Sequence, residues 1–167
     1  AGNTTGILVG GDDVHFDRVA IDTVSPNPMI DLVSSVTGTG FTNSAFVRTV
    51  GSGDAIEIGR ANTDVTIDFT TIRSTAPAGG ALAVTGGSRA TIQNSILAGT
   101  TSDLRVGSSS STATVRSSNL RPLKTTVDPS GTLVSGTGNQ STLPLFAGPS
   151  DFHQAAGSPT IDAANPA

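Results

Sequence analysis

Asp31, Glu57 and Arg105 are the residues whose types and spacing most resemble a catalytic group. Each stands in the middle of an apolar triplet, IDL, IEI or LRV in one-letter code. If these triplets form neighbouring strands, the carboxyl groups of Asp31 and Glu57 lie roughly 5 Å apart, which suits a retaining glycosidase. The alternative is a pair of solvated acids that turn away from each other and do no chemistry.

A second set of polar residues is a candidate for ligand binding: His15, Asp17, Asp68 and Arg116. Two further acids, Asp12 and Asp13 in the segment GGDDV, could give oxygen ligands to Ca²⁺. Calcium needs about 6 to 8 donors, however, and an Asp-rich turn more simply bonds to its own backbone. Apart from this Ca²⁺ hypothesis, the sequence predicts no cofactor.

Three series of apolar residues recur along the chain with a common period. Their members are spaced by 23, 26, 26 and 22 residues in the first series, 25, 26, 25 and 23 in the second, and 25, 26, 24 and 24 in the third. The series are Ile7, Ile30, Ile56, Leu82, Leu104; Phe16, Phe41, Ile67, Ile92, Val115; and Ile21, Phe46, Ile72, Ile96, Leu120. A coil stacked on copies of itself buries one residue of each series per turn, whereas a flat sandwich does not keep three series in step.

Segments rich in Gly, Asn and Ser separate the series and predict corners between short strands. We therefore expect an all-β fold, a right-handed parallel β-helix that forms a single-stranded solenoid of about five to six coils. The coils occupy residues 1–123, and residues 124–167 form a last partial coil and an irregular C-terminal cap that lies over the final coil. Outward side chains form rows as well, one of them Leu8, Asp31, Glu57, Ala83 and Arg105. At the bend after the second series we expect a ladder of amides, Asn43, Asn94 and Asn119.

The repeats VTIDFTTI and ATIQNSILAGT, with the tail GTGNQSTLPLFAGPSDFHQAAGSPTIDAANPA, resemble bacterial right-handed parallel β-helix repeat proteins of the pectate-lyase-like superfamily. The tail is similar to the closing segment of secreted members, which implies an extracellular or cell-surface location. The resemblance implies one of two functions for the chain. It is either a polysaccharide lyase or glycoside hydrolase, or a non-catalytic surface, adhesion or spacer module. Such lyases combine an acidic calcium cluster with an Arg or Lys base on one outward face, which Asp31, Glu57 and Arg105 match only loosely.

Composition favours the non-catalytic function. The chain has no Trp or Tyr to stack on sugar rings, and most of its six Phe residues fall on inward series. A net charge of -4 without a basic face disfavours nucleic acid as a partner, and no apolar run approaches the ~20 residues of a membrane span. Without cysteine, neither a disulfide nor a thiolate metal site can form.

We therefore expect a non-catalytic extracellular or cell-surface module, structural or adhesive and with polysaccharide as its candidate partner, in a longer chain or assembly. The alternative is a carbohydrate-active enzyme, a lyase or glycoside hydrolase, that uses the outward acids. No helix precedes the first coil to cover it, so we also expect end-to-end contact through that coil.

Overall fold

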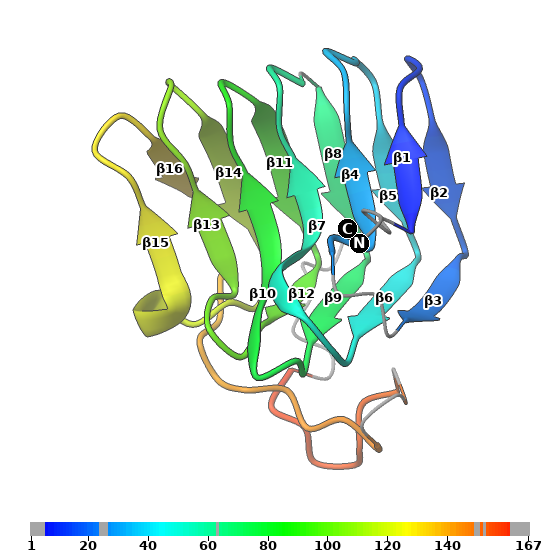
Figure 1. The fold of residues 1–167 in the computed structure, drawn as a ribbon. Helices are drawn as coiled ribbons and strands as arrows, with labels where there is room; N and C mark the ends of the chain where they lie inside the picture. The colour runs from blue at the N-terminus through cyan, green and yellow to red at the C-terminus, as the bar shows by residue number, and fades with distance from the viewer. Residues whose placement is uncertain (1–5, 24–26, 63, 149–150, 152, 161–167) are drawn as a thin grey trace.

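The computed structural model describes residues 6–23, 27–62, 64–148, 151 and 153–160 (Figure 1). Within these residues, short parallel strands stack side by side in three sheets. The one helix of this part of the chain is a 3₁₀ turn, η1 (Pro122–Lys124). The fold is the all-β parallel solenoid that the three apolar series predict.

The strands of each sheet come from successive coils. The first sheet contains β1 (Ile7–Val9), β4 (Ile30–Leu32), β7 (Ser52–Ile58), β10 (Ala78–Val84), β13 (Leu104–Val106) and β15 (Thr125–Val127). The second contains β2 (His15–Asp17), β5 (Gly40–Thr42), β8 (Val65–Asp68), β11 (Arg89–Gln93), β14 (Thr112–Arg116) and β16 (Thr132–Ser135). The third contains β3 (Ala20–Thr23), β6 (Ala45–Arg48), β9 (Thr71–Ser74) and β12 (Ile96–Ala98).

The second apolar series forms one continuous inward stack. Its in-register neighbours are Phe16, Phe41, Ile67, Ile92 and Val115. At the N-terminal end of this stack the rings of Phe16 and Phe41 lie parallel, with centroids 5.0 Å apart, and Phe46 meets both rings edge-on. The aromatic residues of the first two coils are therefore part of the core, as the sequence predicts.

In the third sheet the prediction is wrong by one residue in the fourth coil. Ile72 pairs with Leu97, whereas Ile96 pairs with Thr71. Leu97 is accordingly buried and Ile96 only partly so. The inward side chain of the third sheet in the fourth coil is therefore Leu97.

A corner residue with positive φ sets this register. The corner positions of successive coils are Asn43, Phe69, Asn94 and Ser117, with φ between 47° and 49°. The inward residues Phe46, Ile72, Leu97 and Leu120 each follow their corner by three positions. Asn43 and Asn94 lie at corners as expected, but Phe69 occupies the corner between them, so their amides do not stack and instead donate to Asp17 and Asp68. Ser117 and not Asn119 occupies the next corner.

One inward position of the third sheet carries an arginine. Arg48 pairs with Ser74, and its side chain is completely buried. Its guanidinium donates to four backbone carbonyls at 2.5–3.0 Å, those of Val50, Ser52, Gly53 and Asp54. Burial lowers the pKa of Arg48, and the charge of Asp54 partly opposes that change. The side chain thus fastens the corner between β6 and β7 from inside.

The described part of the C-terminal tail lies beside the third sheet (Figure 1). Asn119 donates to the carbonyl of Thr142 at 2.5 Å, and Arg73 of β9 donates to the carbonyl of Gly148 at 2.9 Å. The guanidinium of Arg73 also lies over the ring of Phe146, 4.5 Å from its centroid. These contacts attach the tail to the flank of the solenoid.

The expected lid over the final coil stays a prediction, because residues 161–167 lie outside the described residues. At the last coil a hollow of about 420 Å³ is lined by apolar side chains, including Val115, Leu120, Val127 and Leu133, and by polar residues up to Ser141. Among the described residues, none after Ser141 lines it. Phe152 and Ile161, two apolar residues of the predicted cap, lie outside the described residues.

Candidate functional site

The structure brings the predicted outward row of the first sheet together. Asp31 pairs with Glu57 across β4 and β7. Ala83 lies between Glu57 and Arg105, so Arg105 is two strand spacings, roughly 10 Å of backbone, from Glu57. At the other end of the row Leu8 pairs with Asp31 and is largely exposed. The register is as predicted, and it leaves the acids and the arginine on one face.

Arg105 is held by an acid that the sequence analysis did not single out. Its Nε and Nη2 donate to Oδ2 of Asp54 at 3.1 and 2.7 Å, across the coil between them. The Asp54 side chain is 7% exposed. Gly80 pairs with Asp54, and a Cβ there would lie 2.0 Å from Oδ1, so the glycine makes room for this carboxylate. Ser102 donates a further, longer bond of 3.4 Å to Asp54.

Glu57 lies among these charges and its pKa is raised. Burial is the main cause, and the negative charges of Asp31 and Asp54 add to it. The positive charge of Arg105 and a hydrogen bond from Thr85 act in the opposite direction but do not cancel the rise. Burial alone would lower the pKa of Arg105, yet its bond to Asp54 and the surrounding acids raise it. The row is thus electrostatically coupled, with Arg105 fixed in its charged form.

The outward row of the second sheet is joined by hydrogen bonds from coil to coil. Arg116 donates from Nε to Oε1 of Gln93 at 2.8 Å, and Gln93 donates to Oδ2 of Asp68 at 2.8 Å. Asn94 donates to the other oxygen of Asp68 at 3.0 Å. Of the predicted ligand-binding residues, Asp68 and Arg116 therefore belong to one polar ladder.

His15 and Asp17 lie apart from that ladder, on the first coil. Gly40 pairs with His15, and a Cβ at Gly40 would lie 2.6 Å from Nδ1, so the imidazole lies over the glycine. Asp17 forms an exposed ion pair of 3.1 Å with Arg18. Asp17 is also two coils from Asp68, because Thr42 pairs with both. The four residues predicted as one ligand site are not gathered in one place.

Asp12 and Asp13 are engaged with the corner of the next coil. Oδ1 of Asp12 accepts from the backbone N–H of Thr37 at 2.8 Å. Asp13 has φ 55°, and its carboxylate lies against Gly38. In the described residues no three His, Cys, Asp or Glu side chains gather as metal ligands. Asp12 and Asp13 thus make the contacts with neighbouring backbone that are typical of an Asp-rich corner.

A ladder of hydroxyl groups links the coils at the corner before the third sheet. Each hydroxyl accepts from a backbone N–H of the preceding coil at 3.1 Å: Ser44 from Val19, Ser95 from Thr70 and Ser118 from Ser95. Each serine directly follows the residue with positive φ at its corner, which is Asn43, Asn94 or Ser117. Sequence analysis missed this ladder, although the spacing of Ser44, Thr70, Ser95 and Ser118 follows the coil period.

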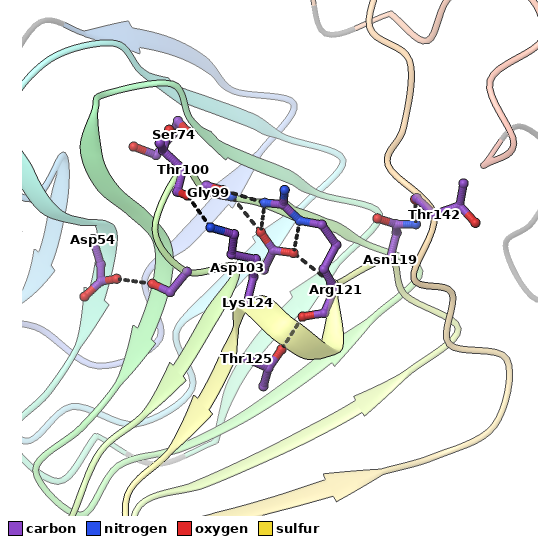
Figure 2. Close-up of polar contacts among 11 residues, drawn as sticks. Asp54, Ser74, Gly99, Thr100, Asp103, Asn119, Arg121, Lys124, Thr125 and Thr142 are labelled. Carbon is purple, nitrogen blue, oxygen red and sulfur yellow. Dashed lines mark hydrogen bonds and ion pairs between the residues drawn. The ribbon is translucent and has the colours of Figure 1, made fainter.

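A second buried ion pair lies at the corner that follows the third sheet. Asp103 is completely buried and accepts from the backbone N–H of Gly99 at 2.9 Å. It also accepts from the backbone N–H and Nε of Arg121 at 2.7 and 2.8 Å, and from its Nη2 at 2.5 Å. Figure 2 shows the carboxylate of Asp103 facing the guanidinium of Arg121, with dashed lines joining the two groups. The hydrogen bond and charge of Asp103 raise the pKa of Arg121 against the opposing effect of burial.

No family model, curated protein or solved structure matches the chain. Among the described residues, no helix has the length and apolar character that would let it cross a membrane.

Proposed function

We propose that this chain is a non-catalytic module of an extracellular or cell-surface protein, in which the solenoid acts as a spacer or an adhesive surface. The observation that carries the proposal is the pairing of Arg105 with Asp54 at 2.7 and 3.1 Å. A lyase needs a side chain that removes a proton from its substrate. Arg105 instead binds a carboxylate of its own stack, and its raised pKa holds its proton more tightly.

On this proposal the chain is a bacterial member of the pectate-lyase-like superfamily that has the β-helix fold but does not cleave polysaccharide. The stacking of parallel strands in three sheets supports the relationship at the level of fold. Fold alone does not define an activity, since function depends on the groups placed on the scaffold. Of the outward groups, Arg105 bonds to Asp54, and Arg116 and Gln93 bond along the second sheet toward Asp68.

Two partners follow from the same proposal. Polysaccharide is the partner of an adhesive module, and it would meet the outward rows of the first and second sheets. The second contact is end to end: β1, β2 and β3 each lie at the end of their sheet in the described structure. Unpaired backbone groups on such strands can accept a further strand.

A carbohydrate-active enzyme is the second candidate, and the raised pKa of Glu57 favours it. A glycosidase acid needs a carboxyl that keeps its proton near neutral pH, beside a second carboxylate. Glu57 and Asp31 are paired neighbours and would take these two roles.

A polysaccharide screen with and without Ca²⁺ separates the two candidates. We expect no new reducing ends and no unsaturated products from the wild-type chain. The matched control is the double variant Asp31→Asn, Glu57→Gln, which should be as inert and as well folded. Cleavage of one polysaccharide by the wild type, lost in the folded double variant, would establish the enzyme and refute the spacer or adhesive module.

A further inference from the structure

The first coil leaves apolar surface exposed that the second coil buries. Phe16 and Ile21 are only partly buried, whereas their in-register neighbours on the second coil, Phe41 and Phe46, are completely buried. The second coil is covered on both sides, while β1, β2 and β3 are the outermost strands of the described structure. A further coil on this N-terminal face would remove the remaining apolar area from water.

The last coil is open at the other end of the solenoid. Val127 of β15 is 43% exposed, although its neighbour Val106 on β13 is completely buried. Leu133 of β16 is partly buried, although its neighbour Ala113 on β14 is completely buried. Both exposed side chains line the hollow of about 420 Å³ at this end. The C-terminal face is therefore hollowed and apolar, and the N-terminal face presents apolar side chains.

The backbone edges of the two ends belong to the same sheets. β15 and β16 lie at one end of the first and second sheets, and β1 and β2 lie at the other end (Figure 1). Every strand pair in these sheets is parallel. A second copy in the same orientation would thus continue both sheets with its own β1 and β2. Unpaired N–H and C=O groups of such edges are templates for further pairing.

The last and the first coil also match in the lengths of their sides. The equivalent positions of the three sides are Thr125, Ser135 and Gln140 on the last coil and Ile7, Phe16 and Ala20 on the first. The intervals between these positions are 10 and 5 residues on the last coil and 9 and 4 residues on the first. Neighbouring coils within the solenoid differ by more, since the period varies from 22 to 26 residues. The two faces can therefore stack as successive coils do.

A contact of one coil on one coil has the size of a stable interface. The coil period of 22 to 26 residues equals what each partner gives to a standard interface, about 20–30 residues a side. The acids at the facing corners are engaged within their own chain. Asp12 accepts from the N–H of Thr37 on the second coil at 2.8 Å, and Asp128 accepts from that of Ser108 on the coil before the last at 3.1 Å.

We propose that the N-terminal face of this chain binds the C-terminal face of a second copy, so that copies stack head to tail. The apolar side chains of the first coil of one copy cover the hollow beside Val127 and Leu133 of the next. The inference rests on the end-to-end contact of the proposed function and names its partner, the last coil of an identical chain. Because the two faces differ, the contact leaves one face of each kind free and the stack grows with each added copy.

Two exposed valines of the last coil give a matched pair of variants. Val127 lines the hollow and is 43% exposed, whereas Val134 continues the outward row of the second sheet and is 47% exposed. Sedimentation velocity of the full chain should show oligomers that grow with protein concentration. Val127→Lys should raise the Kd of association by about tenfold or more, because stacking buries its unpaired charge, and Val134→Lys should change it little.

A wild-type chain that stays monomeric at every concentration would overturn the stack and favour the predicted lid over the last coil. Equal effects of the two lysine substitutions, in variants with wild-type circular dichroism, would overturn the role of the apolar hollow. The polysaccharide screen is independent of both results. A monomer that cleaves nothing loses the stack but keeps the spacer or adhesive module, whereas cleavage refutes the module in any state of assembly.

A disulfide between copies tests the orientation without a change in the apolar faces. In the head-to-tail stack, His15 of one copy is the direct neighbour of Val134 of the next, because both continue the same outward row. A mixture of His15→Cys and Val134→Cys chains should therefore form disulfide-linked heterodimers. Thr126→Cys, on the first sheet of the same coil, is the control and should not cross-link to His15→Cys. Homodimers of Val134→Cys in place of the heterodimers would contradict the head-to-tail contact.

Discussion

Asp103 and Asp17 form ion pairs of the same chemical type in opposite surroundings. Asp103 is completely buried against Arg121, whereas Asp17 and Arg18 are 42% and 82% exposed. Removing one partner of a buried pair leaves the other charge unpaired, at a cost of about 3–5 kcal/mol, while exposed pairs contribute about 0–1 kcal/mol. We expect Asp103→Asn to lower the free energy of unfolding in urea by the larger amount and Asp17→Asn to change it little. Equal effects of the two substitutions would contradict the buried pair.

The raised pKa of Glu57 has a consequence for stability with a definite sign. Because the folded protein binds this proton at a higher pH than the unfolded chain does, the carboxyl contributes stability at low pH. That contribution is lost as the pH rises through the raised pKa. Glu57→Gln removes the titration, so the variant should gain stability relative to wild type between acidic and neutral pH. Urea unfolding across that range measures the gain, and a constant difference between the two chains would show that the pKa of Glu57 is not raised.

The pairing of Arg105 with Asp54 could not be predicted from the triplet pattern. Asp54 lies before the triplet of its own coil, and two small residues of the next coil, Gly80 and Ala83, leave room for the ion pair to cross it. The spacing of outward residues predicts which residues share a row. It does not predict which side chains reach across an intervening coil to form an ion pair. The sequence signal that could have predicted this ion pair is the presence of Gly80 and Ala83 on the coil between Asp54 and Arg105.

At the scale of the strand, the apolar series predicted most inward positions because parallel stacking repeats one residue per coil. The error at Ile96 arose where two adjacent apolar residues could each continue the series. The corner with positive φ decides between them, since the inward residue follows three positions later in each neighbouring coil. With Leu97 in the third series, its spacing becomes 25, 26, 25 and 23, the same as that of the second series.

This register gives a matched pair of core substitutions. Leu97→Ala removes a buried side chain and should cost about 2–5 kcal/mol of unfolding free energy. Ile96→Ala removes a side chain that is only partly buried and should cost clearly less. Chemical denaturation of both variants measures the difference. A larger loss for Ile96→Ala would reverse the assignment of inward and outward faces in β12.

At the scale of the whole molecule, the sequence predicted a C-terminal cap, and the described part of the tail is attached to the flank of the third sheet. Apolar residues of the tail indicated that it packs on the solenoid, and the flank of the third sheet offers the cation of Arg73 and the amide of Asn119 as well as apolar contact. A hollow lined by Thr100 and Lys124 of the coils and by Leu145 of the tail brings together residues that lie far apart in the sequence. No local motif carries such a hollow, so periodicity could not reveal it.

Every row, corner ladder and candidate site in this molecule depends on the coil-to-coil register of the solenoid. The chain has no cysteine, so an introduced pair can be oxidised without competing thiols. Thr66 and Thr91 are direct neighbours on β8 and β11, and Thr114 is the next residue along the same row. One strand spacing of about 4.8 Å lies within disulfide range, whereas two spacings exceed the limit of about 7 Å.

The most direct measurement of this register is the yield of disulfide in two double variants. The first variant combines Thr66→Cys with Thr91→Cys, and the second combines Thr66→Cys with Thr114→Cys. Peptide mapping after mild oxidation should find the cross-link in the first variant and reduced thiols in the second, both chains remaining folded. A folded first variant that stays reduced, or a cross-link that forms in the second instead, would contradict the stacked parallel coils.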